Sequence, residues 1–329
     1  YEVHLCCRND TDGPIDPPFC DRYIDLPFER SPFARGNLAV YRQLKQLMDT
    51  EQYALIHCNT PVGGVLGRLA ARASRKQGTR VVYTAHGFHF FDGASLKNWL
   101  VFYPVERWLS RFTDLLITIN REDYARAQKF HAQRTALVSG VGVDLSRFDQ
   151  PVDRAAVRAG LGLGLEEPAL ICVGEHSVRK NHETVIRAAA RASGSHVLFC
   201  GVGEKQPELE ALANELGIGE KVHFLGFRRD IPQLLAASDV FVFPSWQEGL
   251  PVAQMEAMAA GLPCVVSNVR GNRDLIADGD GGYLCAPDDA AAFAQRIQTL
   301  LDNPQLREQM GRRNRLEMKK YSLQAVLDE

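Results

Sequence analysis

Two glutamates and an adjacent pair of basic residues have the types and spacing best suited to ligand chemistry in this sequence. Glu248 and Glu256 lie eight positions apart, and Arg179 and Lys180 are neighbours in the chain. A carboxylate accepts hydrogen bonds from hydroxyl groups, whereas guanidinium and ammonium groups neutralise a diphosphate through charge-assisted hydrogen bonds. Together, the four side chains suit a ligand that carries both hydroxyl groups and phosphates.

The segment that follows Glu248 has the features of a helix start. Gly249 frees the backbone, and Pro251 suits the first helical turn, where its missing N–H costs nothing. The free N–H groups and the positive dipole end of such a helix bind phosphate. Two carboxylates would repel a phosphate, so they are better explained as acceptors for ribose and sugar hydroxyls on either side of a diphosphate. The alternatives are a helix cap with a solvated glutamate, and a solvated basic pair at Arg179 and Lys180.

A histidine is the main candidate in the first half of the chain. His86, followed by Gly87, comes at the predicted carboxyl end of a strand, where a polar side chain can meet a ligand. A purely structural histidine is the alternative. Gly201 and Gly203 follow another predicted strand and allow close backbone approach, without the rest of a dinucleotide-binding fingerprint. The histidines and cysteines have no metal-ligand spacing, so we expect no metal and no cofactor.

The elements that must position these residues are predicted by the hydrophobic pattern. Short β-branched runs alternate with amphipathic stretches, which is typical of α/β domains with parallel sheets and helices on both faces. The predicted strands are residues 2–7, 54–58, 80–84, 115–118, 135–138, 169–173, 196–200, 222–225, 240–243, 264–267 and 282–285. The predicted helices include residues 38–49, 65–77, 183–192, 206–216 and 290–302. A pause at residues 149–168 predicts a boundary between a domain of residues 1–150 and one of residues 151–329.

Composition excludes several classes of protein. The 329 residues suggest two domains, and 45% hydrophobic with 24% charged residues is typical of a globular chain. A net charge of −2 makes a nucleic-acid partner unfavourable. No run approaches the ~20 apolar residues of a membrane-spanning helix. The 8 cysteines form no Cys-x-x-Cys pair, which favours reduced, buried thiols and a cytoplasmic location.

In E-G-L-P-V-A-Q-M-E-A-M-A-A-G-L-P, Glu248 and Glu256 resemble the E-x7-E signature of family 4 retaining glycosyltransferases (glycosyl transferases group 1). Supporting matches along nearly the whole chain include T-A-H-G-F-H-F-F at 84–91, G-V-D at 142–144 and K-N-H at 180–182. The resemblance implies the GT-B fold, with two facing Rossmann-like domains. It is nearest to bacterial enzymes that build capsular polysaccharide, exopolysaccharide or other cell-surface glycans.

The resemblance also implies roles in binding a nucleotide-sugar donor, with UDP as the expected nucleotide and GDP-mannose as the alternative. Glu248 would contact the donor sugar and Glu256 the ribose, while Lys180, helped by Arg179, would hold the diphosphate. Many family members have Arg after the glycine of the first phosphate loop, where this chain has Glu175. The diphosphate would therefore depend more heavily on Lys180.

Further implied contacts come from the backbone and from the first domain. The amides of Gly249 and Leu250 would add hydrogen bonds to the diphosphate, and His86 would reach the transferred sugar. Enzymes of this family are metal-independent, in keeping with the missing metal motif. The first predicted strand resembles the second strand of the family's opening pattern. The usual first strand, glycine-rich loop and helix, which line the acceptor side, would then be missing.

The acceptor is expected to be a glycan or a lipid-linked sugar. Residues 88–112 are rich in aromatics, and core packing is preferred because Pro104 would interrupt a helix there. Peripheral contact with the inner face of the cell membrane is the alternative for this stretch. A nucleotide-sugar 2-epimerase, a non-catalytic two-domain ligand-binding protein and an inactive partner subunit are the rival functions.

Overall fold

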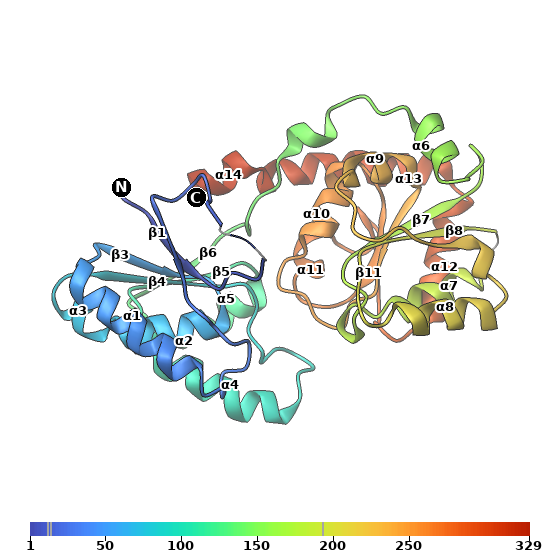
Figure 1. Cartoon of the computed structure of the whole chain (residues 1–329). Helices are drawn as coiled ribbons and strands as arrows, with labels where there is room; N and C mark the ends of the chain where they lie inside the picture. Colours follow the sequence, from blue (N-terminus) through green and yellow to red (C-terminus); the bar gives the residue numbers. More distant parts are fainter. Residues whose placement is uncertain (12, 14, 193) are drawn as a thin grey trace. The chain divides into compact units, whose positions relative to one another are not determined.

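A computed structural model describes residues 1–11, 13, 15–192 and 194–329 of the chain. Contacts divide the chain into two compact units, Tyr1–Leu137 (unit 1) and Val138–Glu329 (unit 2). Both units consist of parallel strands and covering helices (Figure 1). The predicted α/β class with parallel sheets is therefore confirmed.

Unit 2 is built on a six-stranded parallel sheet with the strand order β12-β11-β10-β7-β8-β9. Its strands are β7 (Ala169–Val173), β8 (His196–Cys200), β9 (Val222–Phe224), β10 (Val240–Phe243), β11 (Cys264–Ser267) and β12 (Gly282–Cys285). All four residues of β10 and of β11 are buried, as expected for a parallel sheet that is covered on both faces. The order reverses between β7 and β10, so the loops after these two strands open from neighbouring positions.

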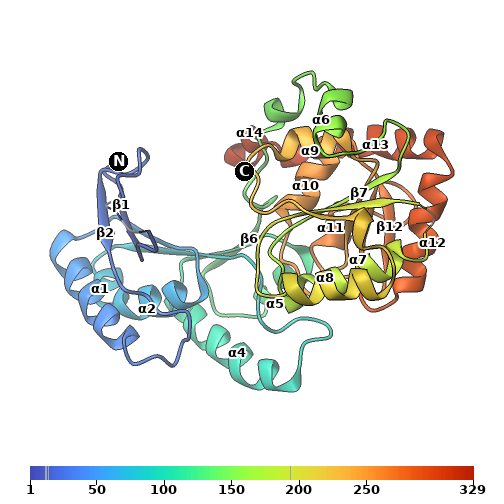
Figure 2. The ribbon, with the colours of Figure 1, turned by 45° about the vertical axis from the view of Figure 1, so that its right-hand side comes forward.

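Helices cover both faces of this sheet. The helices α7 (His182–Ala189), α8 (Gln206–Glu215) and α12 (Ala290–Leu301) lie on one face, and α9 (Ile231–Ala237), α10 (Val252–Ala259) and α13 (Pro304–Met318) on the other (Figures 1 and 2). The other described α-helices of unit 2 are α6 (Arg154–Gly160), α11 (Asn272–Leu275) and α14 (Leu323–Asp328). Helix α10 is the one that carries Glu256.

Unit 1 contains a four-stranded parallel sheet in the order β3-β4-β5-β6 and a separate parallel pair, β1-β2. These strands are β1 (His4–Cys7), β2 (Arg22–Asp25), β3 (Leu55–Cys58), β4 (Arg80–Ala85), β5 (Leu115–Thr118) and β6 (Arg134–Leu137). The helices are α1 (Asn37–Glu51), α2 (Pro61–Ala70), α3 (Arg72–Lys76), α4 (Leu96–Leu109) and α5 (Arg121–Ala127). Helices α1 and α2 pack side by side (Figures 1 and 2).

Every predicted strand is present, with small shifts at the ends. Three local predictions were wrong. The short strand β2 was missed, because its four residues lack a clear alternating pattern. The predicted helix 65–77 is two helices that meet at Ala71. Helix α4 continues through Pro104, which removes one hydrogen bond of the helix without ending it.

Residues 138–150 belong to unit 2 by contact, which places the division between the units earlier than the pause at residues 149–168. The reason is a set of bonds to the C-terminal segment. The Val143 amide donates to the Tyr321 carbonyl at 2.9 Å, and the Leu323 amide donates to the Val143 carbonyl at 2.9 Å. The Ser139 hydroxyl is 2.6 Å from a carboxylate oxygen of Glu329.

Candidate functional site

The loops after β7 and β10 meet at one edge of the unit 2 sheet. Strands β7 and β10 are parallel neighbours, so both loops leave from the same edge. The Trp246 amide donates to the Arg179 carbonyl at 2.9 Å. The Asn181 side-chain amide donates to the Pro244 carbonyl at 3.0 Å and to the Pro287 carbonyl at 2.7 Å. Asn181 has φ 56°, in the left-handed region that asparagine tolerates better than most residues.

This arrangement brings Arg179 and Lys180 to Glu248. The Lys180 ammonium is 2.8 Å from Oε1 of Glu248, and the Arg179 guanidinium is 3.1 Å from the same oxygen. The side chains of Glu248 and Lys180 are 7% and 12% exposed, whereas that of Arg179 is 47% exposed. One carboxylate between two cations leaves a net charge of +1. An ammonium group has three donors, so Lys180 can hold Glu248 and still donate to an anion.

Two further contacts hold this cluster in place. The Arg270 guanidinium donates through Nε to the backbone carbonyl of Glu248 at 2.9 Å. The Lys180 ammonium also lies 4.5 Å from the centre of the Phe243 ring, a cation–π contact that is strengthened by burial. Lys180 is therefore positioned by an acid on one side and by an aromatic ring of β10 on the other.

Glu256 lies on α10 and is paired with an arginine that sequence reasoning missed. The Arg147 guanidinium is 3.0 Å from Oε1 of Glu256, and the Glu256 side chain is 15% exposed. Burial raises the pKa of Glu256 above its usual value, and the nearby Arg147 opposes that rise. Arg147 lies three residues after the G-V-D segment, so its place in that motif was the available signal.

The start of α10 lies between the two glutamates. Pro251 precedes the first helical residue, Val252, and the first amides of α10 have no partners within the helix. Leu250 is buried against Gly140, where an added Cβ would lie 2.7 Å from the Leu250 side chain. The carbonyl of Gly249, in this loop, faces Gly271. The predicted donor residues of unit 2 thus lie on the loops after β7 and β10 and on α10.

We expect Gly271→Ala to displace the Glu248 loop. Gly271 has φ +35°, and an added Cβ would lie 2.5 Å from the Gly249 carbonyl oxygen. A clash with backbone must shift the loop, with an expected stability loss of about 1–3 kcal/mol and weaker nucleotide binding. Thermal unfolding with and without UDP measures both effects. Gly279→Ala is the matched control, because Gly279 also has a positive φ (+83°) but open space around the added Cβ. Equal effects of the two changes would contradict this prediction.

The glycines after β8 have a structural use. An added Cβ at Gly203 would lie 2.4 Å from the His176 carbonyl oxygen, and one at Gly201 would lie 2.0 Å from the Gly174 carbonyl oxygen. Their close backbone approach is to the loop after β7, which carries Arg179 and Lys180. His182 follows the same loop, and burial lowers its pKa to about 3, so it packs as a neutral ring.

In unit 1, His86 lies directly after β4 at the carboxyl end of the sheet, with an exposed side chain. Its Nε2 is 3.5 Å from the Asn59 side-chain oxygen, a long contact. His57 is 2.8 Å from the Thr84 hydroxyl, and the His89 ring stacks on Phe102. Of the three histidines, His86 thus has the weakest of these contacts with a neighbouring side chain. Its contact with a transferred sugar stays a prediction.

Two searches cover the described part of the chain. No group of three or more His, Cys, Asp or Glu residues within it is arranged to hold a metal ion. None of its helices is long and apolar enough to cross a membrane.

The fold of this chain is shared by solved structures. Sucrose-phosphate synthase from Thermosynechococcus elongatus has a TM-score of 0.83 and 25% identity, over 99% of this chain and 86% of that one. The Anabaena protein Alr3699/HepE, solved with UDP and glucose, has a TM-score of 0.79 and 23% identity, over 93% of this chain and 83% of that one. These neighbours are glycosyltransferases of the GT-B type.

Sequence comparison gives the family. Residues 1–147 match Glycosyltransferase Family 4, and residues 153–317 match Glycosyl transferases group 1. The chain is 42% identical to the glycosyltransferase EpsD of Bacillus subtilis, over all of this chain and 87% of that protein. It is 28% identical, over 92% of this chain and 81% of the relative, to the Escherichia coli UDP-Gal:α-D-GlcNAc-diphosphoundecaprenol α-1,3-galactosyltransferase. The chain therefore belongs to the family 4 glycosyltransferases (glycosyl transferases group 1), as the E-x7-E pattern indicated.

Proposed function

We propose that this glycosyltransferase moves a sugar from a nucleotide-diphosphate donor, a UDP-sugar, to a glycan or lipid-linked acceptor in cell-surface polysaccharide synthesis. The observation that carries the proposal is the Glu248–Lys180–Arg179 cluster beside the start of α10, with Glu256 further along that helix. Cations and helix amides attract a diphosphate, and each glutamate can accept hydroxyl hydrogen bonds. The named substrate of the Escherichia coli relative, UDP-Gal, supports the choice of UDP.

In this proposal, the diphosphate is held and stabilised without a metal ion. Lys180 donates to its oxygens, with Arg179 and the amides of Gly249 and Leu250 beside it. As the bond from the sugar C1 to the phosphate oxygen breaks, its electron pair moves to that oxygen, where fixed cations and amide dipoles stabilise the charge. Glu248 orients the sugar through its hydroxyls, and Glu256 holds the ribose.

The configuration at C1 is retained in this proposal. The acceptor oxygen forms its bond to C1 on the face that the phosphate leaves, and its proton passes to the departing phosphate. No residue of this chain is required as a covalent nucleophile. His86, from unit 1, would contact the transferred sugar.

We also propose that the enzyme works in the cytoplasm beside the inner membrane face on a lipid-linked acceptor. Helix α4 supports this contact, because its side chains are divided between two environments. Trp99 and Tyr103 pack in the aromatic core of unit 1, whereas Leu96, Leu100 and Trp108 are 81%, 77% and 45% exposed. Exposed apolar residues on one helix are typical of proteins that rest on a membrane surface. The E. coli relative's named acceptor carries a diphosphoundecaprenol lipid.

Thermal unfolding with UDP, GDP and ADP tests the donor class. At 100 times its dissociation constant, a nucleotide should stabilise the folded protein by about 2.7 kcal/mol. We expect UDP to raise the unfolding temperature most. A larger shift with GDP or ADP would contradict the UDP assignment, and no shift with any of the three would contradict a nucleotide donor.

Transfer assays then test the chemistry. With a UDP-sugar and an acceptor lipid, we expect a product with the anomeric configuration of the donor, formed equally well with a chelator present. Inversion in the product, or loss of activity that manganese restores, would contradict the mechanism. A 2-epimerase would change the donor sugar without releasing UDP, so the released nucleotide separates that alternative.

A further inference from the structure

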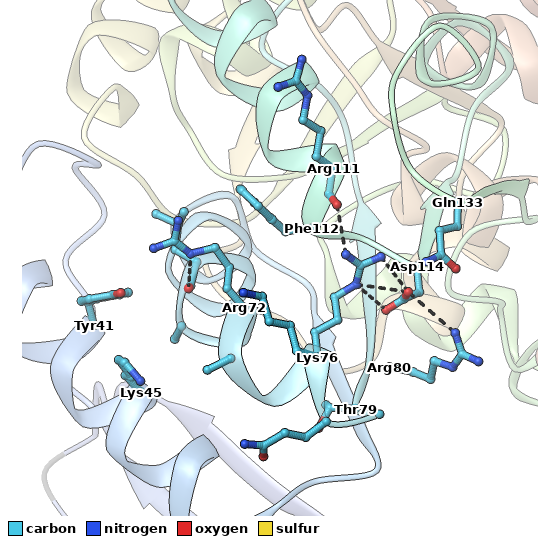
Figure 3. Close-up of a pocket in the computed structure, with 16 residues that line it drawn as sticks. Tyr41, Lys45, Arg72, Lys76, Thr79, Arg80, Arg111, Phe112, Asp114 and Gln133 are labelled. Carbon is cyan, nitrogen blue, oxygen red and sulfur yellow. Dashed lines mark hydrogen bonds and ion pairs between the residues drawn. The ribbon is translucent and has the colours of Figure 1, made fainter.

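A second candidate site lies in unit 1, at the end of the sheet opposite to His86. A pocket with a volume of about 990 Å³ opens where β4, β5 and β6 begin. Its walls come from α1, α3, the short helical turn at Ser110–Phe112 and the residues just before β5 and β6 (Figure 3). His86 follows the last residue of β4, whereas Arg80, in this pocket, is the first. The pocket is therefore separated from His86 by the length of β4.

The lining of this pocket is strongly basic. Its cationic residues are Lys45, Arg72, Arg75, Lys76, Arg80 and Arg111. Asp114 is the one acidic residue among the described lining residues, so the pocket has a formal charge of six minus one, or +5. The whole chain has a net charge of −2. The positive charge is thus concentrated here, and a neutral sugar would not need it.

Asp114 neutralises only part of this charge. Arg75 holds it through Nε at 3.0 and 3.1 Å and through a terminal nitrogen at 2.8 Å, and Arg80 lies 3.8 Å away (Figure 3). The Val81 amide also donates to Asp114 at 2.8 Å. Burial opposes ionisation of Asp114, but these bonds outweigh it and lower its pKa. Arg75, which also donates to the Arg111 carbonyl at 3.1 Å, is therefore a fixed part of the wall.

Two of the remaining cations, Arg72 and Lys76, are available to a ligand (Figure 3). Lys45 is paired with Asp49, outside the pocket lining. Among the residues that the structure describes, Arg72, Lys76 and Arg111 have no carboxylate within ion-pair distance. The Arg72 guanidinium is positioned 5.5 Å from the centre of the Phe112 ring, and Lys76 lies beside it between α1 and Asp114 (Figure 3). Unpaired arginine and lysine side chains around a hollow suit phosphate oxygens, which accept several charge-assisted hydrogen bonds.

We propose that this pocket binds a phosphate-bearing anion at a site separate from the sugar-transfer chemistry. The ligand is recognised through its phosphate groups, principally by Arg72 and Lys76, with Arg75 and Asp114 as the rigid wall. A soluble polyphosphate or phosphate ester and the headgroup of an anionic lipid share this chemistry. The proposal does not depend on the nucleotide donor, because none of its residues belongs to the Glu248 cluster.

Two probes distinguish the sources of phosphate. Isothermal titration with sodium tripolyphosphate, in saturating UDP, measures binding of a soluble anion outside the donor site. Co-sedimentation with vesicles of equal parts phosphatidylcholine and phosphatidylglycerol, against pure phosphatidylcholine, measures binding of a lipid headgroup. The double variant Arg72→Gln/Lys76→Gln removes the two central charges from exposed positions. Arg30→Gln/Lys129→Gln is the matched control, because it removes two exposed charges of unit 1 that neither line the pocket nor lie on α4.

We expect at least one probe to bind the unaltered protein and to bind the pocket variant roughly tenfold or more weakly, while the control variant keeps its affinity. Tripolyphosphate binding assigns the site to a soluble anion, and binding of the acidic vesicles alone assigns it to a headgroup. UDP should raise the unfolding temperature of the unaltered protein, the pocket variant and the control variant by the same amount. If UDP raises none of them, the donor assignment fails, whereas the two phosphate probes judge the pocket proposal independently. The proposal is overturned if neither probe binds, or if the pocket and control variants lose affinity equally.

Discussion

Lys180→Ala should abolish most of the activity and most of the affinity for a nucleoside diphosphate. Lys180 is largely buried, and its ammonium is held 2.8 Å from Glu248 and 4.5 Å from the Phe243 ring centre. We expect a fall in kcat/KM of roughly 10²–10³-fold, the usual effect of removing one fixed group that stabilises transition-state charge. Stability should also drop by about 1–3 kcal/mol, since Glu248 loses a buried partner and keeps only the half-exposed Arg179.

Two comparisons show whether the loss comes from the diphosphate. Binding of uridine, which has no phosphates, should be nearly the same in Lys180→Ala as in the unaltered protein, whereas UDP binding should be much weaker. Lys205→Ala is the matched control, because that lysine of the same unit is 31% exposed and pairs with Glu208 at 2.8 Å, away from Glu248. A similar loss of uridine and UDP affinity would mean that Lys180 supports the fold of the site and not the phosphates.

Glu256→Gln is expected to have the second largest effect, on affinity more than on stability. A carboxylate that accepts hydroxyl hydrogen bonds contributes about 1.5–3 kcal/mol, so UDP should bind about 10- to 100-fold more weakly. Burial raises the pKa of Glu256, which means that its ionised form costs the folded state some stability above that pKa. A neutral glutamine avoids that cost. Arg147, at 43% exposed, can be solvated by water when its partner is lost.

The pH dependence gives an independent readout of the same residue. Uridine affinity of the unaltered protein should fall as the pH drops toward the raised pKa of Glu256, because the protonated acid is a poorer acceptor. Uridine is the probe because it keeps the ribose but has no phosphate whose own protonation would change binding. The Glu256→Gln variant should lack this decrease. Titration calorimetry, from neutral pH down to the lowest pH at which the protein stays folded, measures the affinity of both proteins. Equal pH profiles would show that Glu256 does not bind the ribose.

Arg147 is the ion-pair partner of Glu256, whose role the affinity and the pH experiments both test. Sequence patterns did not predict this arginine. Its guanidinium donates to Oε1 of Glu256, an oxygen of the carboxylate that we propose binds the ribose. This guanidinium opposes the rise in the Glu256 pKa that burial causes, and so favours the ionised form that accepts hydroxyl hydrogen bonds. Arg147 is 43% exposed, so it can turn toward solvent. Only the fold of residues 138–150 onto unit 2 brings it within 3.0 Å of a residue more than a hundred positions later.

The strand pattern and the principal acids could be predicted from the sequence because they depend on local chemistry. A buried parallel strand must be a short apolar run, so β7, β8, β10 and β11 were found with their bounds intact. The glycine and proline after Glu248 predicted a helix start, and α10 begins there. Helix α4 was harder, because Pro104 is a strong local signal for a helix end and the aromatic packing around Tyr103 outweighs it.

By itself, the sequence determined the α/β class, the family and the identity of the candidate donor residues, since each of these is written in short-range patterns. The tertiary structure decided which charges meet. It paired Glu248 with Lys180 and Glu256 with Arg147, and it gathered six cations of unit 1 in one pocket with a single described acid, at the start of β4, β5 and β6. Such pairings depend on which strands become neighbours in a sheet. Strand order is set by the packing of whole elements, which no local run of residues specifies.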